Sequence, residues 1–259
     1  MKRWITFDLD GTLMQNPFQE WVFPEIAAAV AAKSGSAIAC DARGEMVAEH
    51  ERRLARHMYV EAYDWDDILC GLLERLGLTL AIDIEQLVIK HSCAPKVYLL
   101  EDGVLDVLAG LKAEGYALAA VTNGFFKFQY PVMQALGLAD LFDAVVTPDR
   151  VGFAKPDVRI FETLRRQGGI AAHVGDRIDH DVCLANRFGT CSVLIDRRLP
   201  PELADMNPVV RANCEAGKQY CARKAQAELT SAKTGLSDPL LPKAVIGSLK
   251  ELADCIEKQ

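Results

Sequence analysis

The stretch Trp4-Ile5-Thr6-Phe7-Asp8-Leu9-Asp10-Gly11-Thr12-Leu13 decides the fold that the sequence predicts. Its first half is short, apolar and β-prone, which is typical of a strand buried on both faces of a parallel sheet. Two carboxylates follow at once, and Gly11 permits the tight turn that comes after them. Because residues two apart on an extended chain share a face, Asp8 and Asp10 are expected to face the same side. The sequence therefore predicts a buried strand that delivers two carboxylates at its carboxyl end.

Beyond residue 95 the pattern alternates between short apolar runs and amphipathic stretches. The expected strands cover residues 117–122, 144–147, 171–175, 192–195 and 244–246, and the expected helices cover 104–112, 130–136, 157–167 and 179–188. Such alternation is typical of parallel strands joined by crossover helices. The sequence therefore predicts an α/β fold, with a Rossmann-like parallel sheet core and helices on both faces.

Two segments interrupt this pattern. Residues 16–95 have helical periodicity and no obvious strand, so we expect an α-helical domain inserted into a core formed by residues 1–15 and 96–259. Residues 197–243 form an extra, mostly helical segment with a polar helical run over 213–233. Because this segment follows a strand that should end at the functional edge, it could border the site, form a dimer contact or be a peripheral addition.

Composition excludes several classes of partner. The chain has 259 residues, and its 29 Lys and Arg against 36 Asp and Glu give a net charge of −7. That balance provides no basic field for a nucleic-acid backbone. No apolar run approaches the roughly 20 residues that cross a bilayer, so no membrane partner is expected. Eight cysteines without C-x-x-C spacing predict reduced thiols and a cytoplasmic location.

Reactive side chains stand at four places where the expected sheet has its carboxyl edge. After Asp8-x-Asp10 these are Thr122-Asn123-Gly124, Lys155-Pro156 and Gly175-Asp176 with the acidic run through Asp181. Pro156 is expected to open the helix that follows Lys155. Each motif alone is common turn or cap chemistry. Because the carboxyl ends of parallel strands lie along one edge, the four motifs together predict one site.

This ordered set of motifs resembles the haloacid dehalogenase superfamily of phosphotransferases. The resemblance covers roughly residues 1–15 and 98–196 and rests on Asp8-Leu9-Asp10-Gly11-Thr12-Leu13, Val121-Thr122-Asn123-Gly124, Ala154-Lys155-Pro156-Asp157 and Gly175-Asp176 with Asp181. The insertion at residues 16–95 resembles the first cap class of that superfamily, so it is expected to be a cap domain. Two features depart from the pattern: His180 stands where Asn is more usual, and segment 197–243 does not match it.

The residues fit the hydrolysis of a phosphate monoester. Asp8 can attack phosphorus to form an aspartyl phosphate. Asp10 is placed to protonate the departing alkoxide and then to deprotonate the attacking water, which requires a raised carboxyl pKa. Neighbouring carboxylates would repel the substrate without a hard cation, and Mg²⁺ prefers such oxygen ligands. We therefore expect a Mg²⁺-dependent phosphomonoester hydrolase that acts on a small phosphorylated metabolite.

The resemblance implies the metal ligands and the substrate contacts. Mg²⁺ would lie among Asp8, the backbone carbonyl of Asp10, Asp176 and Asp181. Asp181 would orient metal-bound waters or Lys155, and its spacing from Asp176 favours it over Asp179. The catalytic residues would be Asp8, Asp10, Thr122 and Lys155. The substrate phosphate would contact Thr122, the backbone amide of Asn123 and Lys155.

Alternatives remain at this point. Asp10 counts against cleavage of carbon-halogen or carbon-phosphorus bonds, since the resemblance implies a non-acidic residue there for those reactions. A sugar phosphomutase would keep both aspartates, and a non-catalytic binding or regulatory module would keep the fold. A homodimer is also left open.

Selectivity is expected to lie in residues 16–95, which would close over the site. Positive charge is concentrated there at Arg52, Arg53, Arg56 and His57, which could grip a second anionic group of a substrate. The spacing of Glu49 and Arg53 instead favours a solvated ion pair. Phe18 and Trp21 could flank the entrance, although aromatic residues more often pack.

Overall fold

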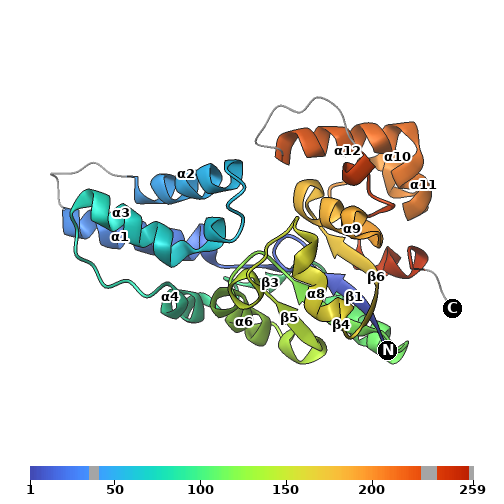
Figure 1. Cartoon of the computed structure of the whole chain (residues 1–259), viewed down its shortest axis with the longest axis horizontal. Helices are drawn as coiled ribbons and strands as arrows, with labels where there is room; N and C mark the ends of the chain where they lie inside the picture. The colour runs from blue at the N-terminus through green and yellow to red at the C-terminus, as the bar shows by residue number, and fades with distance from the viewer. Residues whose placement is uncertain (35–40, 229–237, 257–259) are drawn as a thin grey trace.

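The protein is described by a computed structural model over residues 1–34, 41–228 and 238–256 (Figure 1). Its central sheet has six strands in the order β5-β4-β1-β6-β7-β8, and all neighbouring strands are parallel. The strands are β1 (Lys2–Phe7), β4 (Ala117–Val121), β5 (Ala144–Val146), β6 (Gly168–Gly175), β7 (Cys191–Ile195) and β8 (Ala244–Ile246). The predicted α/β fold with a parallel sheet is therefore confirmed.

Successive residues of the strands are buried on opposite faces of the sheet. Ile5 and Phe7 of β1 belong to the largest apolar cluster. Trp4, one position earlier, belongs to a second cluster with Ile160 and Phe161. Because apolar side chains cover both faces, β1 has the continuous hydrophobic sequence that first indicated a buried parallel strand.

The helices of the core lie close to their expected positions, with one correction. They are α5 (Val104–Ala113), α6 (Phe126–Ala135), η4 (Ala139–Leu141), α7 (Pro148–Val151), η5 (Val158–Phe161), α8 (Glu162–Arg165), η6 (Ile178–Val182), α9 (Cys183–Phe188) and η8 (Leu249–Asp254). The prediction that Pro156 opens a helix is wrong. The Asp157 side chain accepts a hydrogen bond from the backbone N–H of Arg159 at 2.9 Å, so it caps a 3-10 helix that begins only at Val158.

Among the described residues, six helices separate the first motif from the rest of the core. They are η1 (Phe18–Val22), α1 (Phe23–Ser34), α2 (Ala42–Ala55), η3 (Glu61–Tyr63), α3 (Trp65–Leu76) and α4 (Ile84–His91). We call residues 16–95 the helical segment. Its α1, α2 and α3 lie together on one side of the sheet, at the left of Figure 1.

Two short strands close the helical segment at its base. β2 (Met14–Gln15) pairs antiparallel with β3 (Tyr98–Leu99). This pairing could not be predicted from the sequence, because two residues are too few to show an alternating pattern. The segment thus leaves and re-enters the core through adjacent strands. The division into a core of residues 1–15 and 96–259 and a cap domain of residues 16–95 stays a prediction.

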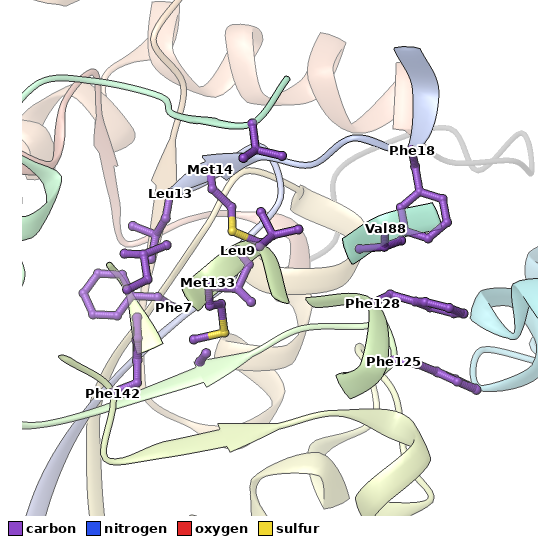
Figure 2. Packing of buried hydrophobic residues seen from close by; sticks show 14 of the residues in the cluster. Phe7, Leu9, Leu13, Met14, Phe18, Val88, Phe125, Phe128, Met133 and Phe142 are labelled. Carbon is purple, nitrogen blue, oxygen red and sulfur yellow. The ribbon is translucent and has the colours of Figure 1, made fainter. Parts of the chain in front are cut away.

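One apolar cluster runs from the sheet into the helical segment. Figure 2 shows Phe7 and Phe142 at one end and Phe18 and Phe128 at the other, with Leu9 and neighbouring side chains between them. Phe18 of η1 contacts Phe128 of α6 edge to face, with ring centroids 5.4 Å apart. This packing fixes the start of the helical segment against the core next to the Asp8 motif.

The extra segment packs beside strands β7 and β8. It contains α10 (Pro201–Ala204), α11 (Pro208–Asn213), α12 (Glu215–Glu228) and η7 (Asp238–Leu240), at the upper right of Figure 1. Cys221 and Ala225 of α12 are buried with Ile178 and Leu194 in a third apolar cluster. The predicted polar helix over 213–233 is confirmed for Glu215–Glu228, and its last residues lie outside the described ranges.

Two further expectations concern the whole chain. Among the described residues, free thiols are present as predicted at Cys70, Cys93, Cys183, Cys214, Cys221 and Cys255, while Cys40 lies outside the described ranges. Among residues 1–34, 41–228 and 238–256, no helix combines the length and apolar character needed to span a bilayer.

Candidate active site

The four sequence motifs converge at the carboxyl edge of the sheet. Asp8 follows β1, Thr122 follows β4 and Asp176 follows β6, and these three strands are adjacent. The backbone N–H of Asp8 donates to Val174 O at 2.9 Å, which ties the end of β1 to the end of β6. Lys155 reaches the same place from the loop after α7. Parallel topology therefore assembles the site from residues that are up to 168 positions apart in the chain.

Lys155 is a buried cation between two carboxylates. Its Nζ lies 2.6 Å from Asp8 Oδ1 and 2.6 Å from Asp181 Oδ1. Burial works to lower the pKa of Lys155, but Asp181 and Asp8 outweigh it and hold that pKa above the ordinary value. The side chain is therefore an ammonium ion, fixed beside Asp8 where it can neutralise an anion.

Asn123 holds Lys155 in place through its side chain. Its Nδ2 donates to the Lys155 carbonyl at 3.1 Å, and its Oδ1 accepts from the Lys155 N–H at 2.7 Å. Both residues are buried. The sequence had assigned only the backbone amide of Asn123, and it did not indicate this second contact because the two residues lie on different loops.

Three carboxylates form a compact acidic cluster. Side-chain oxygens of Asp8, Asp176 and Asp181 lie within 4.8 Å of one another. Burial and the repulsion of Asp8 and Asp181 raise the pKa of Asp176 well above its usual range. Although burial opposes it, the ammonium of Lys155 holds the pKa of Asp181 below its usual range. A cluster of this kind needs more positive charge than one lysine supplies, and its all-oxygen donor set fits Mg²⁺.

The Asp8 motif approaches Asp176 closely at Gly11. This glycine has φ +79°, and a Cβ built on it would lie 2.5 Å from Asp176 Oδ2. The next residue, Thr12, donates from Oγ1 to Asp176 Oδ1 at 3.3 Å. Glycine is therefore needed here both for the backbone conformation and for the space that the carboxylate occupies.

Asp10 is held from one side only. Gln129 Nε2 of α6 donates to Asp10 Oδ2 at 2.6 Å, while Asp10 Oδ1 is buried without a hydrogen-bond partner. Burial and the neighbouring charge of Asp8 raise the pKa of Asp10 to about 6. A carboxyl group with such a pKa can both give and take a proton near neutral pH, which is the property expected of a general acid and base.

A cavity of about 260 Å³ lies over Asp8 and Asp10. It is lined by site residues that the sequence had singled out, namely Asp8, Asp10, Thr122, Asn123 and Lys155. It is also lined by residues that sequence reasoning missed, among them His50, Tyr63, Trp65, Gln129 and Arg177. These come from the helical segment, from α6 and from the loop after β6, and no local motif marks them. Asp176 and Asp181 lie beside the lining, within the acidic cluster.

The other candidate residues of the helical segment divide into those that line the cavity and those that do not. Phe18 lines the cavity, while Trp21 does not and is 40% exposed. Arg53 pairs with Glu49 at 2.9 Å and with Asp67 at 2.6 Å. Neither it nor its basic neighbours Arg52, Arg56 and His57 line the cavity over Asp8. The ion pair of Arg53 with Glu49 that the helix spacing predicted is therefore confirmed, although its side chains are half-buried rather than solvated.

Behind the acidic cluster, two buried histidines occupy β6 and η6. His173 Nε2 lies 3.0 Å from Asp181 Oδ1, and its Nδ1 lies 2.8 Å from Thr6 Oγ1. His180, which departs from the usual Asn, lines the cavity. Burial lowers the pKa of His180 to about 4, so its ring is neutral. Neutral His180 adds no positive charge to the site.

The extra segment supports the site from outside. Glu228 of α12 accepts from the backbone N–H of Ile178 at 2.7 Å, in the turn between Asp176 and Asp181. Within this segment, the described residues 197–228 and 238–243 do not line the cavity over Asp8. Of the three roles left open for this segment, its described residues give no support to a border of the entrance, and Glu228 instead contacts the backbone between Asp176 and Asp181. Its part in a dimer stays a prediction.

Comparison with known proteins agrees with this geometry. A family model described as haloacid dehalogenase-like hydrolase matches residues 2–189. Glyceraldehyde 3-phosphate phosphatase of Methanothermobacter thermautotrophicus is 36% identical over 98 residues, which are 36% of this chain and 43% of that protein. Phosphoserine phosphatase of Thermus thermophilus is 37% identical over 108 residues, which are 40% of this chain and 43% of that protein. The chain thus spans less than half the length of these curated relatives.

Among solved structures, a haloacid dehalogenase-type phosphatase from Thermococcus onnurineus resembles the whole chain. The TM-score is 0.66 at 25% identity, and the match covers 97% of this chain and 96% of that one. The match therefore includes the helical segment and the extra segment as well as the sheet.

Proposed function

The chain belongs to the haloacid dehalogenase-like hydrolase family, and from this membership we propose that it is a Mg²⁺-dependent hydrolase of small phosphate monoesters. The observation that carries the proposal is the meeting of Asp8, Asp10 and Lys155 at one cavity, beside the acidic cluster of Asp8, Asp176 and Asp181. The phosphatase names of two relatives support the same reaction class.

In the first step Asp8 is the nucleophile. A carboxylate oxygen of Asp8 attacks phosphorus, and the bond between phosphorus and the ester oxygen breaks. The ester oxygen leaves as an alcohol because Asp10 donates a proton to it. Lys155, with Thr122 and the backbone amide of Asn123, binds the phosphoryl oxygens while this charge moves.

In the second step water releases the phosphate. Asp10, now a carboxylate, takes a proton from the water that attacks the phosphorus of the aspartyl phosphate. Inorganic phosphate departs, Asp8 returns as a carboxylate, and Asp10 is protonated again. The pKa of about 6 and the unpartnered Oδ1 of Asp10 suit both directions of transfer.

The acidic cluster would hold the metal through side-chain oxygens of Asp8 and Asp176 and through the backbone carbonyl of Asp10, with Asp181 orienting Lys155. Bound Mg²⁺ would supply positive charge that offsets the carboxylates and the transferring phosphoryl group. The raised pKa of Asp176 supports this assignment, since the site is short of positive charge by itself.

The test is phosphate release from p-nitrophenyl phosphate by the full chain with Mg²⁺. We expect turnover that EDTA abolishes and that Asp8→Asn lowers by at least about 10³-fold. Asp102→Asn makes the same change at an exposed position outside the cavity and should act like wild type.

Three results would contradict the proposal. If folded protein released no phosphate from a broad panel of phosphate esters, the proposed hydrolase activity would be wrong. If Asp8→Asn protein kept full activity, the assignment of Asp8 as the nucleophile would be wrong. Transfer of phosphate between sugar hydroxyls without release to water would identify the phosphomutase alternative instead.

A further inference from the structure

Among its described residues, 16–34 and 41–95, the helical segment brings no Lys, Arg, Asp or Glu side chain to the cavity over Asp8. Its lining residues are Asn16, Phe18, Gln19, Phe23, His50, Tyr63 and Trp65. The rings touch one another: the centroid of Phe23 lies 4.8 Å from that of Trp65, and His50 stacks on Trp65 at 5.0 Å. The segment therefore offers apolar faces and amide groups to whatever part of a substrate extends beyond the phosphate.

The two titratable members of this wall are neutral near pH 7. Burial lowers the pKa of His50, and its Nδ1 donates to the Ala62 carbonyl at 2.6 Å. Burial raises the pKa of Tyr63 to about 12, so its phenol keeps its proton. His50 and Tyr63 therefore act as neutral hydrogen-bonding groups.

The cations of the lining are already engaged. Lys155 lies between Asp8 and Asp181. Arg177 makes a two-pronged pair with Asp179, from Nε to Oδ1 at 2.9 Å and from Nη2 to Oδ2 at 2.7 Å. Arg43 of the helical segment donates to Gln19 at 3.0 Å but does not line the cavity. Among the described lining residues, a second anionic group on a substrate would therefore meet no cation that lacks a carboxylate partner.

We infer that the substrate is a small phosphate monoester whose leaving group is an uncharged alcohol, and that a carboxylate or second phosphate on the leaving group is selected against. This inference rests on the proposed function. A second anion would lose its hydration against aromatic rings without a counter-charge, which is costly. Hydroxyl groups would find the amide of Gln19 and neutral His50. The volume of 260 Å³ lies below the ~300 Å³ at which pockets for drug-sized ligands begin, which favours a small leaving group.

A matched pair of esters tests the inference on the full chain with Mg²⁺. Glycerol 3-phosphate and 3-phosphoglycerate share the carbon skeleton and the primary alkoxide that leaves, and they differ in a hydroxymethyl against a carboxylate. We expect kcat/KM to be at least about 30-fold higher for glycerol 3-phosphate. p-Nitrophenyl phosphate serves as the third ester and reports on the proposed function alone.

The outcomes separate the two proposals. Hydrolysis of p-nitrophenyl phosphate with no preference for glycerol 3-phosphate would overturn the inference and leave the hydrolase intact. Folded protein that hydrolyses none of the three esters would overturn both. If 3-phosphoglycerate is preferred and Arg177→Gln abolishes that preference, Arg177 is an anion clamp and the inference is wrong.

Adding a cation to the wall provides the converse test. Gln19 is exposed at one edge of the cavity, so Gln19→Lys should fold normally. In this variant we expect the ratio of kcat/KM for glycerol 3-phosphate to kcat/KM for 3-phosphoglycerate to fall by about tenfold or more. The cause would be a lower KM for 3-phosphoglycerate. Gln219→Lys makes the same change on the exposed face of α12 and should leave the ratio unchanged. If the ratio of kcat/KM values were the same in Gln19→Lys and Gln219→Lys, the leaving group would not lie beside Gln19 and the inference would be wrong.

Discussion

Gln129 Nε2 donates to Asp10 Oδ2 at 2.6 Å, from a helix 119 residues further along the chain. The side chain of Gln129 passes directly over Gly124, where a Cβ would lie 2.2 Å from Nε2. The bond fixes one oxygen of Asp10 and leaves Oδ1 unpartnered. Gln129 thus selects which oxygen of Asp10 is free to exchange a proton with the leaving group.

Replacing Gln129 by leucine should shift the pH dependence of the reaction. Burial raises the pKa of Asp10 to about 6, and the hydrogen bond from Gln129 limits that rise. Because leaving-group departure needs protonated Asp10, kcat/KM should fall as pH increases through this pKa. In Gln129→Leu the pKa of Asp10 is higher, so the fall should occur at higher pH, with a loss of about 10- to 100-fold at the optimum.

The measurement is a pH profile of kcat/KM for an alkyl phosphate with wild type and variant side by side, which cancels the titration of the substrate. Gln134→Leu, an exposed position on the same helix, is the matched control. Identical descending limbs in wild type and Gln129→Leu would show that Gln129 does not act on Asp10.

Asp176→Asn should stabilise the protein in the absence of metal. Burial and repulsion from Asp8 and Asp181 raise the pKa of Asp176 well above the ordinary value of an aspartate. In the unfolded chain this carboxyl ionises at its ordinary pKa. Above that pH, folding requires the carboxyl either to take up a proton or to keep an unfavourable buried charge, so the free energy of unfolding falls as pH rises. Removing the charge should increase the free energy of unfolding by about 1–3 kcal/mol at pH 8, and by less at pH 5.

Thermal unfolding in EDTA at the two pH values checks this, with Asp102→Asn as control. Added Mg²⁺ should raise the Tm of wild type but not that of Asp176→Asn. A variant that is less stable than wild type in EDTA at pH 8 would show that the acidic cluster carries no repulsion to relieve.

The parallel sheet and the meeting of the motifs could be predicted from the sequence for a simple reason. Buried parallel strands have continuous apolar sequences, and parallel topology brings residues that follow them, such as Asp8 and Asp176, to one edge. Lys155 was also predicted as a site residue. The structure of its loop was not predicted, because capping by Asp157 delays the start of the helix until Val158.

The wall of the cavity could not be predicted in the same way. Gln129, His50 and Trp65 become neighbours of Asp8 only through packing between the helical segment and α6, and such packing depends on contacts far apart in the sequence. The pairing of β2 with β3, which sets where that segment leaves the core, involves two residues on each side. Periodicity carries no signal at that length.

Glu228→Ala should weaken the site from outside it. The variant leaves the N–H of fully buried Ile178 without its 2.7 Å partner, which should cost about 1–3 kcal/mol of stability. Because that turn joins Asp176 to Asp181, we also expect a higher Mg²⁺ concentration for half-maximal activity. Glu228→Gln keeps an acceptor oxygen and should retain most activity, and Glu215→Ala on the exposed face of α12 is the control. Unchanged Mg²⁺ dependence in a folded Glu228→Ala protein would exclude the supporting role.

Gly11→Ala should separate backbone strain from loss of the metal site. Gly11 has φ +79° and Gly189 has φ +87°, so alanine at either position should cost about 1 kcal/mol of stability. A Cβ at Gly11 would lie 2.5 Å from Asp176 Oδ2, whereas a Cβ at Gly189 would have no heavy atom within 4 Å. Only Gly11→Ala should therefore displace the carboxylate, and we expect it to lose activity by about 10²-fold while Gly189→Ala stays near wild type. The measurement is the steady-state rate of both variants across a series of Mg²⁺ concentrations. Equal losses of activity in the two variants would mean that the closeness of Gly11 to Asp176 has no part in catalysis.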